Sequence, residues 1–166
     1  KTKAVKDMIL RRNPQATIQT FEENLLDLPW HEQMDRLQGS DLVIATTDST
    51  AAQFMANELC SSLQIPSLYV GCYERACAGE VLFVKPGQTA CFNCFMEFRQ
   101  SYLSELKKKE QRIPYSDEQP SDLKAEPGLA IDIACIVAIA SAYALALLLP
   151  DSNRNSLLDL ERNLVL

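Results

Sequence analysis

Two cysteines, Cys91 and Cys94 in the stretch ACFNCF (residues 90–95), stand at the C-x-x-C spacing. Thiolates at this spacing supply half of a structural zinc site, which is closed by four ligands. The chain has no second pair of cysteines three apart and only one histidine. Three interpretations of the pair stay open: half of a structural zinc site, a redox pair whose thiols are made more acidic at the start of a helix, and two unligated thiols.

Asp48 is the second candidate, because it follows the apolar run DLVIATT of residues 41–47. Such a run is typical of a buried parallel strand, and open parallel sheets bind ligands beyond the carboxyl ends of their strands. A carboxylate at that position can hold a magnesium ion against substrate phosphates. The alternative is that Asp48 or Ser49 only caps the helix that follows. Local features alone favour the capping role, because a strand followed by an aspartate is common.

The elements that must position these residues alternate between helix and strand over the first half of the chain. Asn13-Pro14 ends the first helix, and Gly39 closes a short second one. Helices are predicted over residues 1–12, 28–40 and 49–63, and strands over residues 16–21, 41–47 and 67–73. This β-α-β order predicts an α/β fold with a Rossmann-like, mostly parallel sheet and helices on both of its faces.

The pattern changes in the second half of the chain. Residues 79–87 follow the preceding strand too closely for a helical crossover, so we expect them to pair antiparallel or to run on as a bent extension. Polar residues 95–127 indicate a short helix followed by a mobile loop. A helix and a final strand complete a single domain. Its predicted parts are residues 1–75 (the second part of a Rossmann-like unit), 76–94 (strand extension and C-x-x-C), 95–127 (crossover segment) and 128–166 (helix over 128–149 and strand over 157–166).

Composition indicates a globular protein of a reducing compartment. The 166 residues are 47% hydrophobic and carry a net charge of −6, which argues against nucleic acid as a partner. The N-terminal residues are charged and amphipathic rather than typical of a signal peptide, so a cytoplasmic location is expected. The apolar residues 133–149 predict a buried helix rather than a membrane span. Four cysteines lie among apolar residues and are expected to be buried thiols: Cys60, Cys72, Cys77 and Cys135.

A set of short motifs, in one order and spacing, resembles a family of adenylyltransferases. The motifs are Lys1, Asn13-Pro14, DLVIATTDST (41–50), ANELC (56–60), Gly79-Glu80 and PGQTACFNC (86–94). They are similar to those of the ThiF, MoeB and ubiquitin-activating enzymes, and the resemblance covers nearly the whole chain. Lys1, twelve residues before Asn13, matches the family lysine that contacts ATP phosphates. Asp48 matches the family's catalytic, magnesium-associated aspartate, and Asn57 and Cys60 match the helix that follows it.

The resemblance implies ATP and Mg²⁺ as cofactors, held by Lys1 and Asp48, and zinc at Cys91 and Cys94. It implies adenylation of the C-terminal carboxylate of a ubiquitin-like or sulfur-carrier protein by a homodimer or pseudo-dimer. No nucleic-acid or membrane partner is expected from the charge and composition given above. Family members begin with a Gly-rich phosphate turn, and those with zinc carry a second C-x-x-C after the final strands. Because this sequence contains neither, we expect part of a larger enzyme, with an incomplete zinc site and no ATP–Mg²⁺ binding of its own.

Departures from the family pattern keep a second interpretation open. Ala45, Ser49 and Gln53 stand where the family has an aspartate, an asparagine and commonly an arginine, and no cysteine nucleophile lies between Cys94 and Cys135. The three changes also fit a degenerate, non-catalytic subunit that scaffolds a partner in an activating-enzyme complex. A third interpretation, a nicotinamide-binding enzyme, requires the Gly-rich turn that this sequence lacks.

Overall fold

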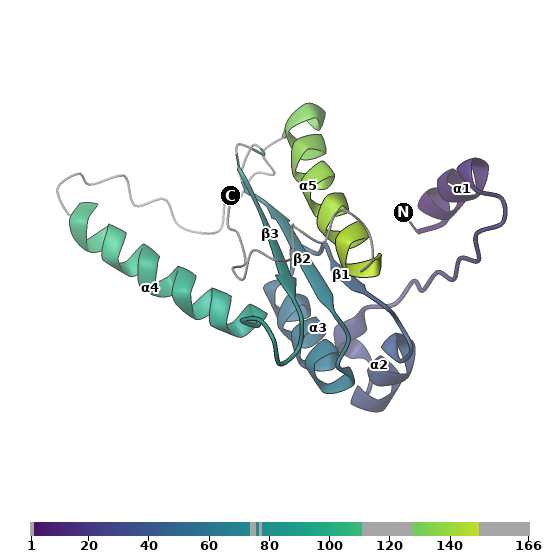
Figure 1. Ribbon diagram of the computed structural model, residues 1–166, viewed down its shortest axis with the longest axis horizontal. Coiled ribbons are helices and arrows are strands. Elements are labelled where there is room, and N and C mark those ends of the chain that lie inside the picture. The colour runs from purple at the N-terminus through teal and green to yellow at the C-terminus, as the bar shows by residue number, and fades with distance from the viewer. Residues whose placement is uncertain (1, 74–75, 77, 111–127, 150–166) are drawn as a thin grey trace.

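A three-stranded sheet forms the centre of the computed structural model, which describes residues 2–73, 76, 78–110 and 128–149 (Figure 1). The first two strands in the order β1-β2-β3 are parallel, and the third is antiparallel to the second. The α/β fold class and the antiparallel pairing of the third strand are therefore confirmed, with a sheet that is mixed. The strands are β1 (Val43–Ala45), β2 (Ser67–Cys72) and β3 (Gly79–Val84).

Helices cover both faces of the sheet, as the sequence predicted (Figure 1). Helix α3 and the first turns of α4 pack on one face, where Tyr69, Leu82 and Val84 contact Phe92 and Phe95. Because side chains alternate along a strand, the intervening strand residues point to the other face and to α5. The helices are α1 (Thr2–Arg12), α2 (Trp30–Leu37), α3 (Thr50–Leu63), α4 (Phe92–Glu110) and α5 (Ala130–Leu148), with a 3₁₀ turn η1 (Leu25–Asp27).

Helix α5 lies close against the sheet because Gly79 leaves room for it. A β-carbon at Gly79 would collide with the Ile136 side chain. Four residues of α5 are buried, whereas large apolar side chains on its other faces, such as Ile131 and Val137, are exposed. The helix is confirmed, but only one of its faces is buried. By length and composition alone α5 would also suit a membrane span, a test that core helices of soluble proteins pass as well.

The predicted strand over residues 16–21 is wrong. These residues form no strand, and only Ala16 and Ile18 among them are half-buried. A strand needs a neighbour that accepts its backbone hydrogen bonds, and the alternation of apolar and polar residues supplies none. Helix α1, which has no buried residue, stands apart from the sheet and is joined to the rest of the chain by this segment (Figure 1). The alternation of apolar and polar residues alone therefore predicted a strand that the sheet does not contain.

Two further expectations need correction. Strand β1 is not buried on both faces, since Ile44 is 49% exposed. The helix expected after residue 95 is not short: α4 begins at Phe92, runs for 19 residues and carries Cys94 in its first turn. The expected loop that follows it and the expected strand 157–166 lie outside the described residues.

Only one of the four cysteines that we expected to be buried is confirmed as such. Cys60 is buried beneath the sheet, where burial raises the pKa of its thiol to about 11 despite a hydrogen bond with Ser67. Cys72 and Cys135 are exposed, and Cys77 lies outside the described residues. Apolar neighbours in the sequence do not bury a residue when it lies at a strand end, as Cys72 does, or on the outer side of a helix, as Cys135 does.

Candidate functional site

The Asp48 side chain is exposed beyond the carboxyl end of β1, and it is not the cap of α3. Ser49 is the capping residue: its hydroxyl oxygen accepts a hydrogen bond from the Ala52 N–H at 3.3 Å. Among the residues that the structure describes, the Asp48 carboxylate has no hydrogen-bond or ion-pair partner. The capping alternative is therefore correct for Ser49 and wrong for Asp48, whose carboxylate is available to a ligand.

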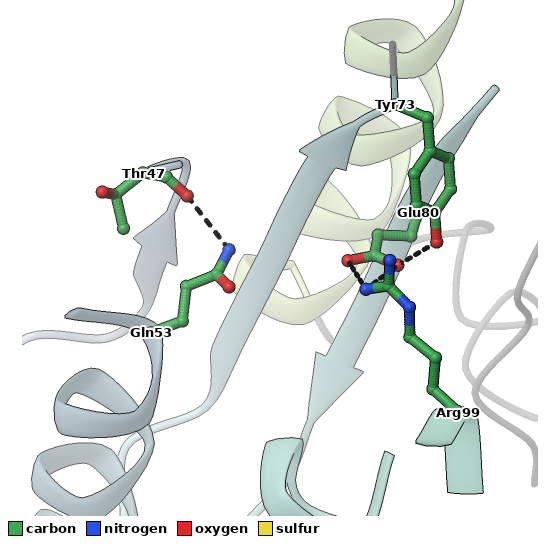
Figure 2. A network of polar contacts seen from close by, with 5 residues as sticks. All are labelled: Thr47, Gln53, Tyr73, Glu80 and Arg99. Atoms are coloured by element: carbon green, nitrogen blue, oxygen red, sulfur yellow. Dashed lines mark hydrogen bonds and ion pairs between the residues drawn. The ribbon is translucent and has the colours of Figure 1, made fainter. Parts of the chain in front are cut away.

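Two neighbours hold the loop that carries Asp48. Gln53, which is buried in the first turn of α3, donates its side-chain N–H to the Thr47 carbonyl at 3.1 Å (Figure 2). The Thr47 hydroxyl in turn accepts a hydrogen bond from the Ser49 N–H at 3.1 Å. Both bonds fix the backbone on either side of Asp48. They therefore limit the directions in which the Asp48 carboxylate can point.

A second polar cluster lies at the same edge of the sheet. Because β1 and β2 are parallel, the carboxyl end of β2 lies beside that of β1, and β3 begins there. The Tyr73 hydroxyl donates to the Glu80 carboxylate at 2.5 Å, and the Arg99 guanidinium approaches the same carboxylate at 3.4 Å (Figure 2). The guanidinium also lies over the Tyr73 ring, 5.1 Å from its centroid. The cluster fixes α4 to strand β3 at this edge of the sheet.

Sequence reasoning missed this cluster, although one signal was present. Glu80 is the single charged residue in the strand GEVLFV, and a charge in an apolar strand needs a partner. Gly71, its neighbour in β2, has no side chain, and a β-carbon there would lie 3.2 Å from Glu80 Cγ. Arg99 lies nineteen residues from Glu80 on another element, so spacing alone does not pair them.

Replacing Arg99 by Met should lower the free energy of unfolding, because the Glu80 side chain, 13% exposed, would lose its only cation among the described residues. We expect a loss of about 1–3 kcal/mol in urea unfolding of the protein. The double variant R99M/E80Q should recover part of that loss, because no buried charge remains. Strictly additive losses in the double variant would contradict the ion pair.

Replacing Tyr73 by Phe should flatten the dependence of stability on alkaline pH. Burial, followed by the hydrogen bond to Glu80 and its charge, raises the pKa of Tyr73 to about 12, from an ordinary value of 10.0. Between these values the unfolded chain loses a proton that the native chain keeps, so the free energy of unfolding falls as pH rises from about 10 to about 12. Urea titrations across this range should give a shallower fall for Tyr73→Phe, and parallel curves would contradict the assignment.

The two cysteines lie at the opposite edge of the sheet from Asp48. Strand β3 runs antiparallel to β2, so the chain that leaves Val84 reaches Cys91 at the edge away from the carboxyl ends of β1 and β2. Cys91 is half-buried and Cys94 is exposed in the first turn of α4. The structure therefore separates the two candidate sites that the sequence proposed. Lys1, the remaining candidate, lies outside the described residues.

The geometry of the cysteine pair fits two ligands of one zinc ion. The sulfur atoms are 3.5 Å apart, close to the roughly 3.8 Å that two thiolates subtend at a tetrahedral zinc with Zn–S bonds of about 2.3 Å. Burial disfavours the thiolate of Cys91, but hydrogen bonds from Cys94, Asn93 and Asn57 outweigh it and hold the pKa of Cys91 below its ordinary value. Within the described ranges no third His, Cys, Asp or Glu joins the pair.

The fold places the chain among the Rossmann-like α/β proteins, whose sheet is covered by helices on both faces. The model of the ThiF family then matches residues 1–160, and the chain belongs to the ThiF family. Over 78 residues it is 33% identical to ubiquitin-like modifier-activating enzyme 5 of Oryza sativa subsp. japonica, covering 47% of this chain and 18% of the relative. Over 103 residues it is 30% identical to the Xenopus laevis enzyme of that name, covering 57% and 26%. The matches thus span about a quarter of these curated relatives or less.

Solved structures share the fold at low sequence identity. The crystal structure of E. coli MccB with ATP has a TM-score of 0.59 and 16% identity, and the likeness covers 88% of this chain and 39% of MccB. A structure of PaaA has a TM-score of 0.54 and 16% identity, with 89% and 46% covered. At such identities the likeness shows the fold alone, so the roles of Asp48 and of the cysteine pair have to be argued from this chain's own residues.

Proposed function

We propose that this chain carries the Asp48 part of the nucleotide site of an adenylyltransferase, which activates the C-terminal carboxylate of a ubiquitin-like or sulfur-carrier protein. The observation that carries the proposal is the exposed Asp48 carboxylate at the carboxyl end of β1, in a chain of the ThiF family. Two hydrogen bonds of Thr47 hold the loop that carries it. The curated relatives are named as ubiquitin-like modifier-activating enzymes, and MccB has been crystallised with AMPCPP together with MccA. The name of the relatives supports a ubiquitin-like protein as one substrate, and the MccB complex supports a nucleotide as the other.

Each residue has a defined task in this proposal. Asp48 would hold Mg²⁺ against the phosphates, and Lys1 would neutralise phosphate charge that develops during the reaction. Gln53 and Thr47 would keep the Asp48 loop in place by the hydrogen bonds described above. Mg²⁺–ATP, when bound, supplies the adenylyl group that is transferred to the carrier carboxylate with release of pyrophosphate.

The proposal gives Cys91 and Cys94 a structural rather than a catalytic task. They lie at the other edge of the sheet from Asp48, where they would hold a zinc ion together with ligands from outside the described residues. A zinc ion there would fix the first turn of α4 to the segment that supplies the remaining ligands. We place no step of the adenylation at this site.

One observation favours a second candidate, a non-catalytic subunit that binds a partner protein. The side chain of Gln53, where the family commonly has an arginine, is buried and already bonded to the Thr47 carbonyl. It therefore offers a ligand no charge and little exposed surface. Ala45 is likewise buried in the core, so no carboxylate faces a ligand there.

Exchange of labelled pyrophosphate into ATP by the full-length protein separates the two candidates. The assay would include Mg²⁺ and, one at a time, the ubiquitin-like and sulfur-carrier proteins of the source organism. The proposal predicts exchange that depends on one carrier and is lost when the C-terminal carboxylate of that carrier is amidated. A full-length protein that binds a carrier without any exchange would be the non-catalytic subunit.

A further inference from the structure

Asn57 is a buried polar residue in the middle of α3 whose side chain is bonded to the start of α4. It is 4% exposed. Its side-chain oxygen accepts a hydrogen bond from the Phe92 N–H at 3.0 Å, and its side-chain N–H donates to the Asn93 oxygen at 3.3 Å. The two residues that it holds are the two between Cys91 and Cys94.

A buried amide in a helix interior costs free energy unless both of its ends are bonded. Among the described residues, Asn57 meets this condition through the cysteine segment alone. The Phe92 N–H belongs to the first turn of α4, where backbone donors have no partner within their own helix. Phe92 is 1% exposed and stacks on Tyr69, with ring centroids 4.7 Å apart, so the segment between the cysteines is fixed by its backbone and by its side chain.

Asn57 thus bonds both residues that set the spacing between Cys91 and Cys94. Because these two residues lie in the first turn of α4, which also carries Cys94, fixing them limits where the two sulfur atoms can lie.

We propose that Asn57 is a positioning residue for zinc bound by Cys91 and Cys94. It holds the two sulfur atoms at ligand spacing before the metal arrives. The inference rests on the zinc site proposed above. It also gives α3 two tasks, because Gln53 and Asn57 lie four residues apart on one side of this helix. Gln53 holds the Asp48 loop, and Asn57 holds the cysteine pair at the other edge of the sheet.

The test compares zinc affinity of the full-length wild-type protein with Asn57→Asp and Asn57→Ala, measured by competition with a chelator. Asn57→Asp keeps the acceptor for the Phe92 N–H but replaces the donor to the Asn93 side chain by a carboxylate oxygen, and Asn57→Ala removes both. We expect affinity losses of about 10- to 100-fold in both variants. The sulfur-to-metal charge-transfer band of the Co²⁺-loaded protein should shift in Asn57→Asp, a change that lower stability alone would not produce.

Gln53→Ala is the matched control, because it removes a buried amide from the same helix without touching the cysteine segment. It should lower stability and leave the zinc affinity unchanged. Variants of Asn57 with wild-type affinity would overturn the inference. A wild-type protein that binds no zinc would instead contradict the proposed zinc site itself. That result is distinguishable from failure of the role proposed for Asn57.

Hydrogen exchange of the wild-type protein tests the inference even if the Asn57 variants do not fold. We expect the Phe92 amide to remain protected after zinc is removed by a chelator, because Asn57 accepts its hydrogen bond without the metal. Rapid exchange of this amide in the zinc-free protein would show that the metal, and not Asn57, orders the cysteine pair.

Discussion

Replacing Asp48 by Asn is expected to reduce carrier-dependent ATP–pyrophosphate exchange of the full-length protein by about 100- to 1,000-fold. The amide lacks the negative charge that holds Mg²⁺ against the phosphates, although it has nearly the same shape. The fold should be unaffected, because the Asp48 side chain is exposed and bonded to none of the described residues. The free energy of unfolding should change by no more than about 0.5 kcal/mol.

Ser49→Ala provides the opposite control. It removes the cap of α3 and should lower stability by about 1 kcal/mol, yet it leaves the Asp48 carboxylate in place. Exchange at saturating ATP should therefore persist in Ser49→Ala, although this variant is less stable. It should fall strongly in Asp48→Asn, although that variant is as stable as the wild type. Near-normal exchange by Asp48→Asn would remove the catalytic assignment of this residue.

The second large effect is expected at the cysteine pair. Freshly purified full-length protein should contain about one zinc ion per chain, and the double variant C91S/C94S should contain none. A metal present at 1,000 times its Kd stabilises the native state by about 4 kcal/mol, so the variant should unfold at a clearly lower urea concentration.

Cys135→Ser is the control for that variant, because Cys135 is an exposed cysteine on α5, away from the pair. It should keep both the zinc content and the unfolding midpoint of the wild type. Elemental analysis that finds no zinc in the wild-type protein would contradict the site and favour the redox or unligated interpretation of the pair.

The sequence was most informative where one short stretch determines the structure. Gly39 ends α2 in a left-handed conformation, the run DLVIATT contains a strand, and the short connection before residue 79 led to an antiparallel pair. In each case the cause lies within a few residues of its effect. The motif around Asp48 was placed correctly at the end of a strand for the same reason, whereas the helix that begins at Phe92 was expected only after residue 95.

Contacts between distant elements were beyond such reasoning. Nothing local shows that Arg99 reaches Glu80 across nineteen residues, or that Asn57 bonds to Phe92 across thirty-five. The alternating segment 16–21 failed for the related reason that a strand depends on a neighbour. The edge of the sheet at which each site lies also depends on the strand directions, so only the structure shows that Asp48 and the cysteine pair lie apart.

A crystal structure of the full-length protein with Mg²⁺ and a non-hydrolysable ATP analogue tests the central claim most directly. We expect the nucleotide beyond the carboxyl end of β1, with an Asp48 carboxylate oxygen about 2.1 Å from Mg²⁺ or joined to it through one bound water. The Thr47–Gln53 hydrogen bond should remain in that complex. A bound nucleotide whose metal ion lies away from Asp48 would contradict the account.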